Sequence, residues 1–388
     1  MAQLVRDWTD PDRTAPDRTD ADRTAPDRIA VDTSTPLGRM TQTFPQTALW
    51  NDSADPEQLR RSMTFGAVGA TCNPVIALAA IKADLPRWTA RIGELADERP
   101  TAGESEIGWR VVEELSIDAA HLLEPVFEEH GGRNGRLSIQ TDPRLHRDAV
   151  ALADQADHFS ALAPNIIVKL PATAAGIEAM EEVTFRGVSI NATLSFTVAQ
   201  VVAVAEAVER GLARREAAGL PTEQMGPVAT IMVGRLDDWL KHTASRAGTL
   251  VGPGTLDWAG VAAFKRAHAI FTERGYRTRL LSAAFRNHLH LSELVGGDVV
   301  ISPPFDWQTR INANGLDLPS RIDAPVDPAI VDELRRLLPD FRRAYDADGM
   351  TVEEFAEFGA TRRTLRQFLA ADAGLATLVR DVLVADPD

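Results

Sequence analysis

Short apolar runs alternate with longer segments of helical periodicity from about residue 46 onward. Most of the runs are continuously apolar rather than alternating, which is typical of parallel strands buried on both faces. The eight predicted strands cover residues 48–51, 68–72, 136–140, 166–170, 188–192, 228–233, 278–283 and 299–302. The clearest helical segments between them cover residues 148–160, 196–210, 258–274 and 285–294.

Eight strand–helix units match the (β/α)8 barrel in number and in size. We therefore predict an α/β fold of the TIM-barrel type. Extra helices are expected after the second strand, with one at residues 107–130, and at the C-terminus, at residues 328–345 and 351–369. A doubly wound sheet is the alternative. That fold usually carries a glycine-rich phosphate turn after its first strand, and residues 50–55, Trp-Asn-Asp-Ser-Ala-Asp, are no such turn.

The N-terminal segment differs in composition from the rest of the chain. Asp-Arg pairs recur every five residues between residues 12 and 28, with Thr, Ala and Pro between them. Such a segment has few apolar side chains to offset the entropy of ordering, so residues 1–45 are predicted to be a disordered leader. Residues 46–388 are interpreted as one domain that includes the C-terminal helices, with a separate C-terminal domain as the alternative.

Composition narrows the classes of function. The chain is 44% hydrophobic and 25% charged, with a formal net charge of −15, which argues against nucleic-acid and anionic-membrane partners. A single cysteine, Cys72, excludes an internal disulfide framework and favours a reducing compartment. No run approaches membrane-spanning length, and the N-terminus lacks the layout of a signal peptide. We expect a cytoplasmic protein.

One lysine stands at the end of a predicted buried strand. The chain has only four lysines, at positions 82, 169, 241 and 265, and Lys169 closes the apolar run of residues 166–168. A desolvated lysine can become a neutral amine that attacks a carbonyl carbon, which an arginine cannot do. The functional interpretation is a Schiff-base lysine. The alternative is an ordinary lysine paired with a carboxylate at a strand end.

Other polar residues lie at the ends of the predicted strands, where TIM barrels place their catalytic groups. They are Asp52, Asn73, Gln140, Asn191, Thr193, Thr230, Arg235 and Arg286. With a Schiff base on Lys169, Asp52 is the carboxylate best placed to take a proton from the departing carbon's hydroxyl. Amides and hydroxyls would hold substrate hydroxyls, and two arginines suit a phosphate.

The chain resembles the transaldolases, class I aldolase-type barrels of sugar-phosphate metabolism. Six motifs carry the resemblance in order, at residues 51–52, 70–74, 165–173, 191–196, 233–235 and 285–287. The resemblance implies transfer of a dihydroxyacetone unit between sugar phosphates without a metal or organic cofactor. It implies that Lys169 forms the Schiff base, that Asp52 is the acid/base residue, and that Arg235 and Arg286 clamp the phosphate.

Two positions depart from the family pattern. Gln140 stands where transaldolases typically carry a glutamate, as in the related fructose-6-phosphate aldolases, but those pair it with a tyrosine where this chain has Met232. Ala284 stands where a serine often helps to bind phosphate, and Ser282 is a candidate substitute. An aldolase or specialised carbon–carbon lyase using the same intermediate, and a non-catalytic relative that binds sugar phosphates, therefore stay open as alternatives.

Three further features favour structural interpretations. His288 and His290 lack a third ligand at suitable spacing, so no metal site is expected. Residues 346–349 resemble part of a calcium loop, but the required flanking ligands are absent, and Thr351 with Glu354 predicts a capping box instead. Cys72 is interpreted as a buried structural thiol.

The sequence does not set the oligomeric state, for which a homodimer stays open.

Overall fold

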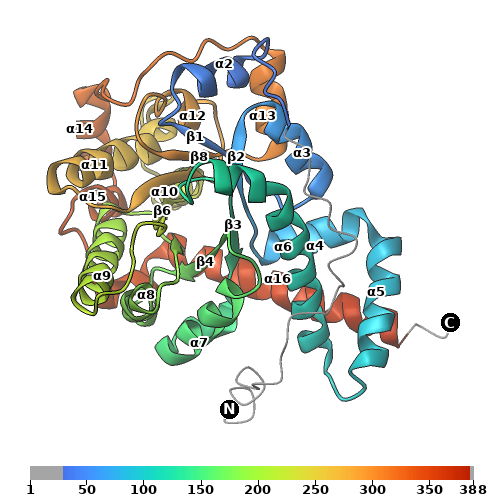
Figure 1. Cartoon of the computed structure of the whole chain (residues 1–388). Coiled ribbons are helices and arrows are strands. Elements are labelled where there is room, and N and C mark those ends of the chain that lie inside the picture. Colours follow the sequence, from blue (N-terminus) through green and yellow to red (C-terminus); the bar gives the residue numbers. More distant parts are fainter. Residues whose placement is uncertain (1–28, 385–388) are drawn as a thin grey trace.

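The computed structural model describes residues 29–384 and places eight parallel strands in one closed barrel (Figure 1). Strands that follow each other in the chain are paired, and β1 pairs with β8 to close the sheet. The strands are β1 (Ala48–Asn51), β2 (Ala67–Thr71), β3 (Arg136–Gln140), β4 (Ile166–Pro171), β5 (Ile190–Thr193), β6 (Val228–Ile231), β7 (Arg279–Ala283) and β8 (Val300–Ser302). The predicted TIM barrel is confirmed, with strand bounds that differ only slightly from the prediction.

Helices surround the barrel and add to it in the two places expected from the sequence (Figure 1). Those up to β6 are α2 (Pro36–Thr43), α3 (Pro56–Thr64), α4 (Pro74–Ala83), α5 (Leu85–Glu98), α6 (Glu104–Glu129), η2 (Pro143–Leu145), α7 (Ala149–Ser160), α8 (Ala174–Arg186) and α9 (Val198–Ala217). Those after β6 are α10 (Val233–Ala247), η3 (Thr255–Trp258), α11 (Ala259–Arg274), α12 (Leu289–Ser292), α13 (Phe305–Ala313), α14 (Pro328–Leu337), α15 (Pro339–Tyr345), η4 (Val352–Glu357) and α16 (Gly359–Leu383).

The interior of the barrel is filled by a small apolar cluster separate from the main core. Its members are Ala48, Trp50, Ile167, Val228, Leu281, Ala283 and Val300. Successive side chains of a strand point to opposite faces, so every second residue shares the interior with this cluster. Lys169 is therefore in line with Ile167, and Thr230 with Val228. The same alternation that places apolar side chains in the interior thus places polar side chains there at the carboxyl ends of the strands.

The C-terminal helix α16 crosses the carboxyl end of the barrel. Arg235, which follows β6, donates a hydrogen bond from Nη1 to Thr364 Oγ1 of α16 at 3.3 Å. Arg144, in the segment after β3, lies 3.5 Å from the carboxylate of Asp372 in α16. Farther along, α16 packs against α4, α5 and α6. One helix therefore connects segments that follow strands on different sides of the barrel (Figure 1).

Three segments differ from the sequence-based expectation. Helix α2 lies within the expected leader and buries Leu37 and Met40, so the ordered chain begins before residue 46; the leader prediction otherwise falls on residues 1–28, outside the described residues. Pro339 divides the helix expected at residues 328–345 into α14 and α15, since proline favours a first helical turn. The capping box at Thr351 is present, but it opens the 3-10 helix η4 before α16.

The helix expected at residues 285–294 is confirmed in part, and its bounds are wrong. Only Leu289–Ser292 is helical, and residues 285–288 form a loop after β7. Ala284 adopts a left-handed backbone with φ 63°, which ends the strand in a turn that helical periodicity does not predict. The loop carries Arg286, so this difference matters for the site.

No helix between residues 29 and 384 combines the length and the apolar character needed to cross a membrane.

Candidate active site

Lys169 lies inside the barrel near the carboxyl end of β4. Its side chain is 3% exposed, and its register partners are Gln140 on β3 and Asn191 on β5. Among the residues that the structure describes, no carboxylate lies within ion-pair distance of Nζ. By contrast, Lys241 and Lys265 form ion pairs with carboxylates at 2.6 and 2.9 Å. Lys169 is therefore not the carboxylate-paired lysine of the alternative interpretation.

The electrostatic surroundings of Lys169 favour a neutral amine. Burial lowers the pKa of its ammonium below the usual lysine range, because the charged form loses its hydration. The negative charge of Asp52 acts in the opposite direction, and the positive charge of Arg235 lowers this pKa further. A lysine with a lowered pKa supplies the unprotonated amine that carbonyl addition requires.

Asp52 follows β1 and is in line with the inward-facing Trp50. Its Oδ1 accepts a hydrogen bond of 2.5 Å from Thr71 Oγ1 at the end of β2, and its backbone N–H donates to Pro303 O at 3.3 Å. These two contacts fix both the carboxylate and the backbone that carries it. The carboxylate also raises the pKa of Lys169, which places the two groups within electrostatic reach of each other. A proton acceptor is thus held near the amine.

A chain of buried hydrogen bonds joins β6, β5 and β3 beside Lys169. Thr230 Oγ1 donates to Asn191 Oδ1 at 2.8 Å, and Asn191 Nδ2 donates to Ser138 Oγ at 3.1 Å. All three side chains are fully buried. The network fixes which way the Asn191 amide faces, so the two predicted binding groups are already oriented. Ser138 was not predicted as a member of the site.

Several buried oxygens near this network have no hydrogen-bond partner among the described residues. They are Gln140 Oε1, Thr193 Oγ1 and Ser302 Oγ, at the carboxyl ends of β3, β5 and β8. A buried polar atom without a partner costs about 1–3 kcal/mol, so it is normally satisfied by water or by a ligand. Three strands thus each place, at the carboxyl end, a buried oxygen that can form a hydrogen bond with a water or a ligand.

Asn73 has a structural role in addition to the predicted one. Its Oδ1 accepts hydrogen bonds from Val75 N at 2.9 Å and Ile76 N at 3.1 Å, which caps the start of α4. The cap uses the carbonyl oxygen and leaves the amide Nδ2 for another acceptor. Of the two polar atoms of the Asn73 side chain, Nδ2 is therefore the one that could donate a hydrogen bond to a hydroxyl of a bound molecule.

The two predicted phosphate-binding arginines lie on adjacent elements. Arg235 lies in the first turn of α10, where Nη1 donates to Thr364 and Gln367 of α16, and its buried Nε has no partner among the described residues. Burial and the nearby Arg286 lower the pKa of Arg235. Arg286 follows β7, is about two-fifths exposed, and its Nε donates to Asp238 Oδ2 at 2.8 Å. Two guanidinium groups close enough to repel each other are a favourable arrangement for binding an anion.

The comparison with known protein families agrees with this geometry. The model of the Transaldolase/Fructose-6-phosphate aldolase family matches residues 49–358, which include all eight strands except the first residue of β1. The chain belongs to this family. It is thus an enzyme of class I aldolase chemistry with sugar-phosphate substrates. Every predicted site residue lies inside the matched range.

Three relatives of this family member are named as transaldolases. It is 28% identical over 324 residues to a transaldolase of Thiobacillus denitrificans, covering 76% of this chain and 88% of the relative. It is 33% identical over 260 residues to transaldolase 1 of Streptomyces avermitilis, covering 61% and 68%. Transaldolase 1 of Streptomyces coelicolor is 32% identical over 264 residues, covering 62% and 68%.

The structure locates three residues that the sequence analysis compared with the family pattern. Ser282 Oγ donates to the carbonyl of His290 at 2.9 Å, so it supports a loop rather than facing a phosphate. Met232 is 4% exposed and stands at the N-cap of α10, where its N–H donates to Ser195 O. Ala284 has the left-handed φ noted above. The serine substitute considered from the sequence is therefore excluded in this transaldolase-family barrel.

The residues interpreted as structural are also located. Burial raises the pKa of the Cys72 thiol to about 12, so the thiolate needed for nucleophilic attack is scarce at neutral pH. His290 is buried against Asp237 at 2.8 Å, while His288 is exposed. Sequence reasoning missed the pairing of His290 with Asp237, because the two residues are far apart in the chain and neither carries a motif.

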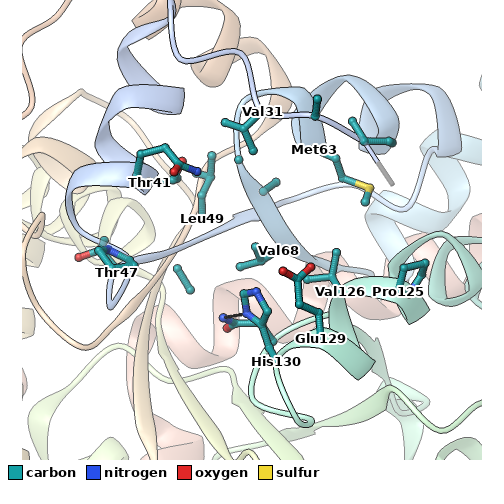
Figure 2. Close-up of a pocket in the computed structure, with 18 of the residues that line it drawn as sticks. Val31, Thr41, Thr47, Leu49, Met63, Val68, Pro125, Val126, Glu129 and His130 are labelled. Atoms are coloured by element: carbon teal, nitrogen blue, oxygen red, sulfur yellow. Dashed lines mark hydrogen bonds between the residues drawn. The ribbon is translucent and has the colours of Figure 1, made fainter. Parts of the chain in front are cut away.

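A hollow of about 550 Å³ lies at the opposite end of the barrel (Figure 2). It is lined by the starts of β1 and β2, with Leu49 and Val68, and by Glu129 and His130 at the end of α6. This is the amino end of the strands, where TIM barrels do not place their catalytic groups. The hollow is separate from Lys169 and plays no part in the site.

Proposed function

We propose that the enzyme transfers a dihydroxyacetone unit from a ketose phosphate to an aldose phosphate through a Schiff base on Lys169. The observation that carries the proposal is a buried lysine that forms no ion pair with a carboxylate of the described residues, while the charge of Asp52, a carboxylate that Thr71 orients, acts on its pKa. A purely binding site needs neither group. The reducing compartment expected from the sequence, the cytoplasm, suits such an enzyme.

The proposed reaction begins with addition of the Lys169 amine to the ketone carbon. Loss of water from the carbinolamine gives an iminium, which withdraws electrons from the neighbouring bond. Asp52 takes the proton of the hydroxyl on the departing carbon, the carbon–carbon bond breaks, and its electron pair forms an enamine. The aldehyde fragment leaves. The enamine then attacks the acceptor aldehyde, Asp52 returns the proton to the new alkoxide, and water releases the product.

The remaining site residues have binding roles in this proposal. Asn191 and Thr230 are fixed beside Lys169 and would hold hydroxyls of the retained fragment, as would the free amide of Asn73. Arg235 and Arg286 would clamp the phosphate. Thr193 stands two residues after Asn191, the register partner of Lys169, and its hydroxyl has no partner among the described residues. It would bind the water that iminium formation releases.

By the resemblance read from the sequence, Gln140 stands where a typical transaldolase would carry a glutamate. Its Oε1 has no partner among the described residues and its backbone is in register with Lys169, so it would orient a water by accepting a hydrogen bond. It cannot accept the proton of that water, as a glutamate would. This observation favours a second candidate, an aldolase that makes or cleaves the same bond without a sugar-phosphate acceptor. A specialised carbon–carbon lyase would use the same groups.

Borohydride trapping with fructose 6-phosphate tests the proposal. We expect peptide mass spectrometry to find a reduced dihydroxyacetone adduct on Lys169 of the wild type, and none on Lys169→Ala. Lys82→Ala is the matched control, since Lys82 is exposed at the end of α4, and it should be trapped normally. No adduct on the wild type, under conditions that trap a known transaldolase, would refute the proposal. Turnover with and without erythrose 4-phosphate then separates transferase from aldolase.

A further inference from the structure

Two fully buried polar side chains lie behind Arg286 and take no part in the chemistry proposed above. His290 Nε2 and Asp237 Oδ2 are 2.8 Å apart, and both side chains are 0% exposed. On its other side, His290 Nδ1 accepts a hydrogen bond of 3.1 Å from the backbone N–H of Arg286. The imidazole therefore bridges a carboxylate on α10 and the backbone of the loop after β7.

The hydrogen-bond pattern assigns one tautomer to His290. A backbone N–H can only donate, so Nδ1 must be unprotonated to accept from Arg286. Nε2 then carries the proton and donates it to Asp237. The other oxygen of the carboxylate, Oδ1, accepts from the N–H of Gly260 at 2.8 Å. Each of these three hydrogen bonds therefore has a defined donor and acceptor, and the carboxylate of Asp237 sets the direction, because it can only accept.

The loop that carries Arg286 depends on contacts of this kind because it has no regular structure of its own. Ser282 Oγ donates to the His290 carbonyl at 2.9 Å, and Ala284 has a left-handed φ of 63°. A Cβ at Gly234 would overlap the Ala284 carbonyl, so the loop lies directly against the first turn of α10. That same turn carries Arg235. The loop and α10 thus set the relative position of the two arginines.

A buried carboxylate–imidazole pair gives no clear advantage in stability over a well-packed apolar pair. Its presence behind Arg286 is explained by the directional hydrogen bond that it delivers to the loop. We propose that Asp237 and His290 are positioning residues that hold Arg286 in place for binding phosphate. The inference rests on the proposed role of Arg286 as a phosphate ligand.

Asp237→Asn is the sharpest test, because it keeps the shape of the side chain and reverses one hydrogen-bonding direction. The introduced amide has only one oxygen, so it cannot accept from both Gly260 N and His290 Nε2. If its NH2 faces His290, the imidazole must protonate Nδ1, which then opposes the N–H of Arg286. The loss of one directional hydrogen bond at the clamp should weaken phosphate binding about 10-fold.

The measurements are the Kd of inorganic phosphate by calorimetry, and KM and kcat with fructose 6-phosphate. We expect Asp237→Asn to raise Kd and KM about 10-fold and to leave kcat within about twofold, since the reacting groups are untouched. Ser282→Ala removes the second support of the loop without changing any charge and should raise both constants by a smaller factor. His288→Gln is the control, an exposed histidine of the same segment, and should match the wild type.

The results separate this inference from the proposed function. A wild type that binds phosphate but is not trapped by fructose 6-phosphate refutes the function, while the variants still test the positioning role. Unchanged phosphate affinity in folded Asp237→Asn overturns the inference. If that variant does not fold, Ser282→Ala decides, because Ser282 Oγ holds the backbone of His290. Unchanged affinity there shows that the position of His290 does not set phosphate binding, which overturns the inference. A wild type without affinity for phosphate overturns both.

Discussion

The hydrogen bond from Thr71 to Asp52 provides a direct test of how this barrel prepares its proton acceptor. Thr71 is 1% exposed, and its hydroxyl donates to the carboxylate at 2.5 Å. Thr71→Val removes the hydroxyl and replaces it by a methyl group of similar size. A hydrogen bond to a charged group contributes about 1.5–3 kcal/mol, so turnover should fall roughly 10- to 150-fold if the bond holds Asp52 in its productive position.

The assay is the steady-state turnover of fructose 6-phosphate with erythrose 4-phosphate, together with the thermal midpoint of each variant. Thr71→Ser is the matched control, since it keeps the hydroxyl and loses only a methyl group, and it should retain most of the activity. Full turnover by Thr71→Val would refute the reasoning, because Asp52 would then be held by other contacts. Equal losses in both variants would assign the effect to packing of the methyl group.

Three further perturbations test other parts of the site. Arg235→Gln removes a positive charge that lowers the pKa of Lys169, so that pKa should rise. The acid limb of the pH profile of borohydride trapping should then move to higher pH, and an unmoved limb would contradict the prediction. Gln140→Glu supplies a proton acceptor, so the rate of iminium formation in rapid trapping should increase about 10-fold or more, and a rate at or below wild type would contradict the assigned role. Gly359→Ala places a Cβ against the Trp239 ring, so the free energy of unfolding in urea should fall by about 1–3 kcal/mol, whereas an unchanged midpoint would show that α16 shifts freely.

The sequence predicted the barrel well because a parallel strand buried on both faces has a nearly continuous apolar pattern. The runs at residues 136–140 and 166–170 are examples, and each became a strand with almost the same bounds. The same reasoning located Lys169, because a charged residue at the end of such a run is conspicuous. The carboxyl ends of the strands converge in a barrel, so Asp52 and Asn191 could be assigned to one site before any contact was known.

Other features depend on contacts that no local pattern records. The loop at residues 285–288 has helical periodicity, but the left-handed φ of Ala284 and the bond from Arg286 N to His290 prevent a helix there. The pairing of His290 with Asp237 joins residues far apart in the chain. The cap that Asn73 forms on α4 is different, because an asparagine followed by proline is a local signature of a helix start.

The unpartnered polar groups of the site lower the folding stability of the protein and at the same time serve its function. Gln140 Oε1, Thr193 Oγ1 and Arg235 Nε are buried without partners among the described residues. Between residues 29 and 384, no carboxylate forms an ion pair with Lys169. Each arrangement is costly until a substrate or a water supplies the missing partner. The apolar cluster around Trp50 and the helices outside the barrel supply the stability that offsets this cost. The barrel thereby keeps an uncompensated amine where a paired lysine would be more stable and unreactive.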